Sequence, residues 1–182
     1  MKLSLFTASV LAFVLMSFSQ SLETYIVRLP PTAFPELPAN LVHELQRRGC
    51  TIPQEAASAK KPNNVIKGEF AKPGQTDWAV LCSVKGVSTI LVFWNGSENN
   101  PDALVPAADS NYVQGNGNGQ WAYSRGIEPM GVEDIFRYHD PDHLGIPLPP
   151  IYHQGINDFF EGKAFLVWYY YDGQWLKVAA GD

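Results

Sequence analysis

The sequence has few cysteines, few charged residues and no recognisable catalytic motif. Only 2 of its 182 residues are cysteine, and 17% are charged. The 13 Lys and Arg are outnumbered by 18 Asp and Glu and are scattered, so a basic face for nucleic acid is not expected. GxSxG, HExxH and CxxC motifs are missing, which argues against a serine-hydrolase elbow, a zincin helix and a thiol-redox site. We expect no cofactor and no nucleic-acid partner.

Long apolar runs are also missing, except at the N-terminus. Met1-Lys2 is followed by LSLFTASVLAFVLMSF and then by the small residues Ser19 and Ser21. This layout predicts a secretory signal peptide over residues 1–20, cleaved near those serines. A buried helix and a retained anchor are the alternatives, but the run is short for a membrane span of ~20 residues. We therefore expect an exported chain, periplasmic or extracellular, with no transmembrane anchor after cleavage and one domain over 21–182.

The two cysteines of an exported chain predict one disulfide, between Cys50 and Cys82. It would close a loop of about 33 residues and would stabilise the fold by ~3.7 kcal/mol on the chain-entropy model. The alternative is a pair of buried free thiols.

The composition favours a β-rich fold with structured loops, because 13% of residues are aromatic and 14 Pro and 15 Gly are present. The apolar alternation on both faces of the segment 77–94 predicts a central hairpin covered on both sides. The predicted class is α+β, mainly antiparallel sheet with one or two short helices packed on it and one disulfide. Strands are expected at 23–29, 64–70, 77–84, 88–94, 111–114, 120–125, 163–171 and 174–179.

Two short helices are expected, at 40–49 and 131–138. Asn40 is the expected N-cap of the first helix, and Gly49 is the expected C-cap. A helical turn is expected at 156–160, and a long loop at 95–110. The glycine-rich tip at 115–119 indicates a flexible turn and not a phosphate cradle, because an aromatic strand and not a helix comes after it.

One cluster of polar residues could carry chemistry. His139, His143, His153 and Asp158 are close in sequence, and imidazoles and carboxylates are ligands for zinc and other divalent ions. The same groups could act in acid–base catalysis. Acidic residues and histidines next to prolines are equally typical of a surface loop. The metal and acid–base interpretations together define one function hypothesis, a hydrolase using these four residues.

The second function hypothesis rests on the aromatic strands. Trp121, Tyr123, Tyr169 and Tyr171 are the candidate binding residues. On a two-sided sheet half of such residues face the core, and the others make an exposed aromatic surface of the kind that binding proteins use. Together with the missing catalytic motifs, this pattern favours a non-catalytic binding domain for a protein or an envelope glycan.

Two local patterns resemble known proteins. Gly68-Glu-Phe70, Gly74-Gln-Thr-Asp77 and Ala79-Val80, within residues 68–94, resemble one FG-GAP-type propeller hairpin. Only one copy is present, Glu69 stands in place of Asp, and the Asp-rich calcium turn is missing, so neither a propeller nor calcium binding is carried over. The segments RRGCTIPQ, GQTDWAVLCS and GINDFFEGKAFLVWYYYDGQW are similar to small exported bacterial proteins without a characterised function. That resemblance implies export and a single domain, and no activity.

Overall fold

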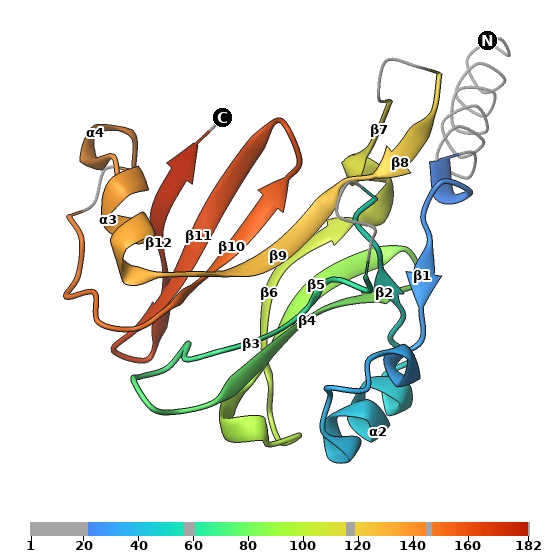
Figure 1. The fold of residues 1–182 in the computed structure, drawn as a ribbon, viewed down its shortest axis with the longest axis horizontal. Helices are drawn as coiled ribbons and strands as arrows, with labels where there is room; N and C mark the ends of the chain where they lie inside the picture. The colour runs from blue at the N-terminus through green and yellow to red at the C-terminus, as the bar shows by residue number, and fades with distance from the viewer. Residues whose placement is uncertain (1–21, 57–60, 116–118, 145–146, 182) are drawn as a thin grey trace, which may run out of the picture.

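A computed structural model describes residues 22–56, 61–115, 119–144 and 147–181 (Figure 1). Within them, two four-stranded antiparallel sheets have the strand orders β3-β4-β5-β6 and β12-β11-β10-β9. Two ribbons, β1–β2 and β7–β8, complete the strands. The signal peptide predicted over 1–20 lies outside the described residues. In the described part of the chain, no helix has the length and apolar character needed to cross a membrane.

The strands fall into these two sheets and two ribbons. The first sheet contains β3 (Val65–Gly68), β4 (Asp77–Val84), β5 (Val87–Phe93) and β6 (Asp102–Ala108). The second contains β9 (Arg125–Met130), β10 (Gly155–Phe160), β11 (Ala164–Tyr171) and β12 (Gln174–Gly181). The ribbons are β1 (Arg28–Leu29) with β2 (Ile52–Pro53), and β7 (Val113–Gly115) with β8 (Trp121–Tyr123). The helices are α2 (Ala39–Arg47), α3 (Val132–Tyr138) and α4 (Pro141–Leu144), with 3-10 turns η1 (Pro31–Ala33), η2 (Trp94–Gly96) and η3 (Asp109–Tyr112).

The two sheets face each other, and helices cover their outer faces. Leu81 of β4 and Ile156 of β10 belong to one core between the sheets. Leu41 of α2 packs in a second core on the outer face of the first sheet. Ile135 of α3 packs in a third core on the outer face of the second sheet. Figure 1 shows this order of layers, with α2 at one end of the molecule and α3 and α4 at the other. The predicted antiparallel sheet is confirmed, and with so little helix the fold is closer to mainly β than to α+β.

The predicted central hairpin is confirmed. On β4, Val80 packs in the core under α2 and Leu81 packs in the core between the sheets, so both faces are covered. The turn to β5 consists of Lys85 and Gly86, with φ of 53° and 77°. Two successive positive φ values match the twist of a two-residue hairpin, and Gly adopts the second at no steric cost.

The predicted disulfide is confirmed. Cys50 and Cys82 are bonded, with their Cα atoms 5.2 Å apart. Gly49, with φ of +73°, turns the chain out of α2 directly before Cys50. The bridge therefore ties the end of α2 to β4, within the core that α2 covers.

Several local predictions are wrong. The strand expected at 23–29 is limited to β1, because residues 22–25 form a turn in which the Tyr25 N–H donates to the Leu22 carbonyl at 3.1 Å. The helical turn expected at 156–160 is β10, which is hydrogen-bonded between β9 and β11 in the second sheet. The loop expected at 95–110 contains β6, where Val105 (φ 49°) makes a bulge opposite β5, and Pro106 is tolerated because β6 is an edge strand. Asn40 does not cap α2: the N-cap position is Pro38, and the Asn40 amide donates instead to the Gly96 carbonyl, 2.9 Å away.

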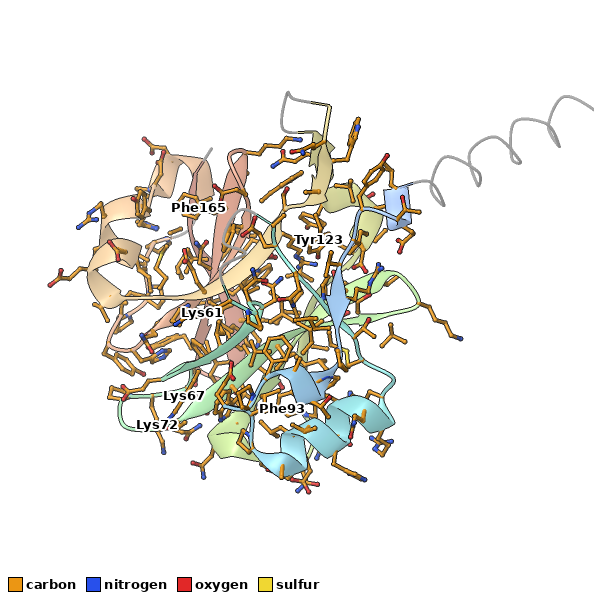
Figure 2. The ribbon with its side chains drawn as sticks, turned by 45° about the vertical axis from the view of Figure 1, so that its right-hand side comes forward. Lys61, Lys67, Lys72, Phe93, Tyr123 and Phe165 are labelled. Atoms are coloured by element: carbon orange, nitrogen blue, oxygen red, sulfur yellow. A yellow bond between two sulfur atoms is a disulfide. The ribbon has the colours of Figure 1, made fainter. Side chains whose placement is uncertain are left out.

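The outer edge of the first sheet carries positive charge. Lys67 lies on the edge strand β3, and Lys61 and Lys72 flank that strand (Figure 2). Lysines on an edge strand discourage another strand from pairing with it, because the incoming chain would have to bury their charge.

Candidate functional site

The predicted metal-ligating residues do not come together. His139 Nδ1 lies 2.8 Å from the Val178 carbonyl oxygen. His153 is buried, its ring stacks on Tyr169 with centroids 4.1 Å apart, and its two ring nitrogens lie 2.9 and 3.0 Å from backbone carbonyl oxygens. Among the residues that the structure describes, no three His, Cys, Asp or Glu side chains could share a metal ion. The side chain of His143 lies outside the described set.

Asp158 belongs to a buried ion pair between the sheets. Arg125 donates from Nε to Asp158 Oδ1 at 2.8 Å and from Nη2 to Oδ2 at 2.9 Å. It also donates to Ser88 Oγ of the facing sheet at 3.1 Å, and its guanidinium lies 4.8 Å from the centroid of the Tyr112 ring. Burial alone would lower the pKa of Arg125, but the hydrogen bonds and charge of Asp158 raise it overall. Asp158 therefore neutralises a core arginine, on the face of the sheet away from the core that contains Tyr169.

Two of the four predicted binding residues are core residues. Tyr123 is 1% exposed and Tyr169 is 0% exposed, so neither can contribute to a binding surface. Tyr123 lies between the sheets (Figure 2), and its pKa is raised chiefly because the ring is buried. Tyr169 points to the α3 side, in the same core as Val167. Tyr171 is half-buried, while Trp121 is exposed.

Trp94, Tyr170 and Trp175 form a group of aromatic side chains that extends the core between the sheets. Trp94 stacks on Trp175 with centroids 5.6 Å apart, and Tyr170 lies 4.7 Å from Trp94. Trp175 Nε1 donates to Asp102 at 2.9 Å. Both tryptophans are partly buried against the core between the sheets, so this group closes one part of that core.

The exposed aromatic Trp121 is part of an apolar patch that the sequence did not reveal. Tyr25, Val27 and Trp121 have exposed fractions of 43%, 64% and 46%, and the rings of Tyr25 and Trp121 lie 6.3 Å apart. We call these three residues the β1 patch.

The chain around β1 alternates in a way that turns this patch outward. Ile26 is buried in the core between the sheets. Arg28 also points inward, where it donates to the buried carboxylate of Asp109 at 2.6 Å and to Glu23 at 2.7 Å. Burial alone would lower the pKa of Arg28, but these two carboxylates raise it overall. Because Ile26 and Arg28 are held inside, Val27 between them is held outside. Tyr25 lies in the turn before them, where its N–H donates to the Leu22 carbonyl at 3.1 Å.

A groove of about 330 Å³ lies beside the patch. Tyr25, Val27 and Leu29 line one side, and residues 54–56 and 61–63 line the other. Gln54 joins the two sides, because its backbone N–H donates to the Val27 carbonyl at 2.8 Å. Within the second side, its side-chain amide donates to the Asn63 carbonyl at 3.2 Å. We call this hollow the β1 groove. With the β1 patch it forms the candidate functional site.

The sequence matches no model of a known protein family, and no curated protein or solved structure is similar to the chain. We therefore infer a function from the chemistry of the site's own residues.

Proposed function

We propose that this protein is an exported, non-catalytic domain that binds a protein partner through the β1 patch and the β1 groove. The observation that carries the proposal is the apolar outer face of the chain at β1. Val27, directly before β1, is exposed where the outward residues of a half-buried strand are ordinarily polar. Tyr25 is exposed in the turn that precedes it. Exposed apolar side chains gathered beside a groove are typical of protein–protein contact sites.

The composition of the site favours a protein over a small polar ligand. Tyr and Trp are enriched at the centres of protein interfaces because they bury a large area and keep a polar tip. The groove adds Leu29 and Pro62 to this apolar area. Of its polar members, Gln54 and Asn63 hydrogen-bond each other, and Glu55 and Lys61 place one charge of each sign on its wall. The geometry suits an extended segment of the partner, whose alternate side chains would enter the groove.

Export is supported by two features of different kinds. The N-terminal pattern is that of a signal peptide, and both cysteines are used in a disulfide, which persists in oxidising compartments. Expression of the full chain in a bacterial host tests this. We expect periplasmic or secreted protein whose mass lacks about 20 N-terminal residues; full-length protein in the cytoplasm would contradict export.

Affinity capture from the envelope and medium of the source organism tests the binding proposal. Val27→Asp should abolish capture or weaken it at least about tenfold, because a carboxylate would be buried without a partner. Phe136→Asp is the matched control: Phe136 is 55% exposed and lies on α3, at the other end of the molecule (Figure 1). Equal capture by wild type and Val27→Asp would overturn the proposal, as would captured material that consists of glycan without protein.

A further inference from the structure

A second and larger hollow, of about 630 Å³, lies on the α3 side of the second sheet. Its walls carry three carboxylates, Glu55, Glu128 and Glu161, and one ammonium, Lys163. The floor consists of Asn157 and two phenylalanines, Phe159 and Phe165. We call it the Phe hollow. It shares no residue with the β1 patch, and one residue, Glu55, with the β1 groove.

The floor is built by one row of residues that crosses all four strands. Phe159 pairs with Gly126 of β9 on one side and with Phe165 of β11 on the other, and Phe165 pairs with Gly181 of β12. Each ring lies over its outer glycine. A Cβ on Gly126 would lie 2.0 Å from Phe159 Cζ, and one on Gly181 would lie 2.5 Å from Phe165 Cε1. The two rings therefore lean away from each other, toward opposite edges of the sheet, which leaves the space between them open.

The neighbouring row places a polar group in this floor. Asn157 pairs with Glu128 on β9 and with Val167 on β11. Its Nδ2 donates to Glu128 Oε1 at 2.9 Å. Its Oδ1 is buried and has no hydrogen-bond partner among the residues that the structure describes, and Asn157 as a whole is only 5% exposed. A buried amide oxygen without a donor is costly, so a small shift of the Asn157 side chain that lets a ligand bring a donor to this oxygen is favoured.

Two of the wall carboxylates are not neutralised by a cation. In the described part of the chain neither Glu128 nor Glu161 forms an ion pair. The ammonium of Lys163 lies over the ring of Phe160, 4.3 Å from its centroid; both residues line the hollow, and in the described part of the chain Lys163 forms no ion pair with a wall carboxylate. Ionised carboxylates only accept hydrogen bonds. The hollow therefore offers acceptors, negative charge and aromatic rings.

We propose that the Phe hollow binds the alkylammonium or guanidinium group of an organic cation. The N–H donors of such a group would satisfy Asn157 Oδ1 and the carboxylate of Glu128. Its positive charge would be attracted by Glu128, Glu161 and the faces of the phenylalanine rings. Its alkyl stem would pack between the rings of Phe159 and Phe165. A volume of about 630 Å³ lies in the range of small-ligand pockets, and the acidic chain, with a net charge of -5, favours a cation.

Titration of ¹⁵N-labelled protein with n-butylammonium chloride tests the proposal. We expect saturable shifts of the Asn157 side-chain NH₂ signals and of the Gly162 and Ala164 amides, with a Kd on the order of 1 mM for so small a ligand. n-Butanol should not shift them, and tetraethylammonium, which has no N–H donor, should bind more weakly. Equal shifts with n-butanol, or no saturable shift with n-butylammonium, would overturn the proposal.

Matched variants test the assignment of residues. Glu128→Gln keeps an acceptor for Asn157 but removes the charge, and should weaken n-butylammonium binding about tenfold, since hydrogen bonds to charged groups are the stronger ones. Glu133→Gln removes an exposed carboxylate on α3 that does not line the hollow, and should leave the affinity unchanged. If Glu128→Gln does not fold, Glu161→Gln in the exposed turn after β10 replaces it. If the hollow variant, Glu128→Gln or its replacement Glu161→Gln, binds n-butylammonium as tightly as the control Glu133→Gln, the proposal is overturned.

The group could belong to a free amine or to a side chain of a peptide. Titration with acetyl-Gly-Lys-Gly-amide beside n-butylammonium distinguishes these sources. Tighter binding of the peptide indicates that the hollow reads a lysine within a chain, and equal or tighter binding of the free amine indicates a small metabolite. Either result supports the cation chemistry.

Discussion

Replacement of Gly126 by alanine is the most direct test of how the second sheet is packed. The new Cβ would lie 2.0 Å from Phe159 Cζ and 2.6 Å from two further ring carbons, whereas non-bonded carbons rest about 3.5–4.0 Å apart. The whole ring must therefore move by more than an ångström. It can only move toward Phe165, its partner on β11, or out toward solvent. Overpacking of this kind costs ~1–3 kcal/mol.

The expected result is a lower melting temperature. For a domain of this size, 1 kcal/mol corresponds to roughly 2–4 °C, so Gly126→Ala should lower Tm by about 2–12 °C in calorimetry. Gly131→Ala is the matched control, since a Cβ there would meet nothing within 4 Å and the residue has φ of -72°. The backbone entropy that Ala removes from the unfolded chain stabilises the fold, but Gly131 is the N-cap of α3, where Ala is less favourable than Gly. Stability should therefore stay within about 1 kcal/mol of wild type.

A double-mutant cycle makes this prediction refutable. In a Phe159→Ala background the ring is gone, and Gly126→Ala should no longer lower Tm. If Gly126→Ala costs the same with and without the ring, or if it matches Gly131→Ala, then Phe159 does not rest on Gly126. The row of leaning rings, and with it the floor of the Phe hollow, would then be wrong.

Three further predictions concern stability. Cys82→Ser should lower the unfolding free energy by ~3–4 kcal/mol in denaturant melts under non-reducing conditions, and an unchanged melt would contradict a structural bridge. Arg125→Met leaves the Asp158 carboxylate buried alone and should cost ~3–5 kcal/mol, while Arg125→Met/Asp158→Leu should recover most of it; a double variant no more stable than the single would refute this. The pKa of Glu44 is lowered to about 2 by hydrogen bonds from Arg47 and then Arg48, so its stabilisation is complete above its unfolded pKa of about 4.3 and is lost as pH falls toward 2. Glu44→Gln should flatten Tm against pH between about 5 and 2, and an unchanged slope would contradict the pairing.

The parts of the fold that the sequence predicts correctly are local. β4 and β5 are joined by two turn residues, and the apolar alternation of both strands is visible without any knowledge of their partners. The same holds for β11 and β12, where Asp172 and Gly173 make a turn with φ of 48° and 78°. The disulfide follows from the count of cysteines alone. In each case the deciding interaction lies within a few residues or has one possible partner.

The parts that the sequence does not predict depend on distant partners. β10 resembles a helical turn because Ile156, Asn157 and Asp158 have no strand alternation of polarity. All three are buried, since the strand lies between β9 and β11 and both of its faces are covered. Asp158 is polar in a core position because Arg125, 33 residues away in the sequence, neutralises it. The sequence shows the two residues but not their pairing.

The candidate site escapes sequence reasoning for a related reason. The segment around β1 has the composition of a strand, but its two faces cannot be assigned from polarity. A charged residue is ordinarily expected outside, which would place Arg28 in solvent and Val27 in the core. The structure reverses this order because Asp109 is buried and binds Arg28. Asp109, far along the chain, therefore holds Arg28 inside and leaves Val27 facing outward.

The inward position of Arg28 and the outward position of Val27 allow the contribution of the β1 patch to stability to be considered apart from its proposed role in binding. Val27 keeps 64% of its surface exposed, so its replacement by a polar residue removes little buried area and should change stability by no more than about 0.5–1 kcal/mol. Tyr25 and Trp121, 43% and 46% exposed, bury more than half of their surface and therefore also contribute to stability. The edge strand β3, by contrast, carries Lys67 and is followed by Lys72 (Figure 2), and such charges disfavour pairing with a further strand. Lys61, on the other side of β3, lines the β1 groove. Packing accounts for the inward positions of Ile26 and Arg28, but it does not require their neighbours to be apolar, and our binding proposal supplies a reason for that.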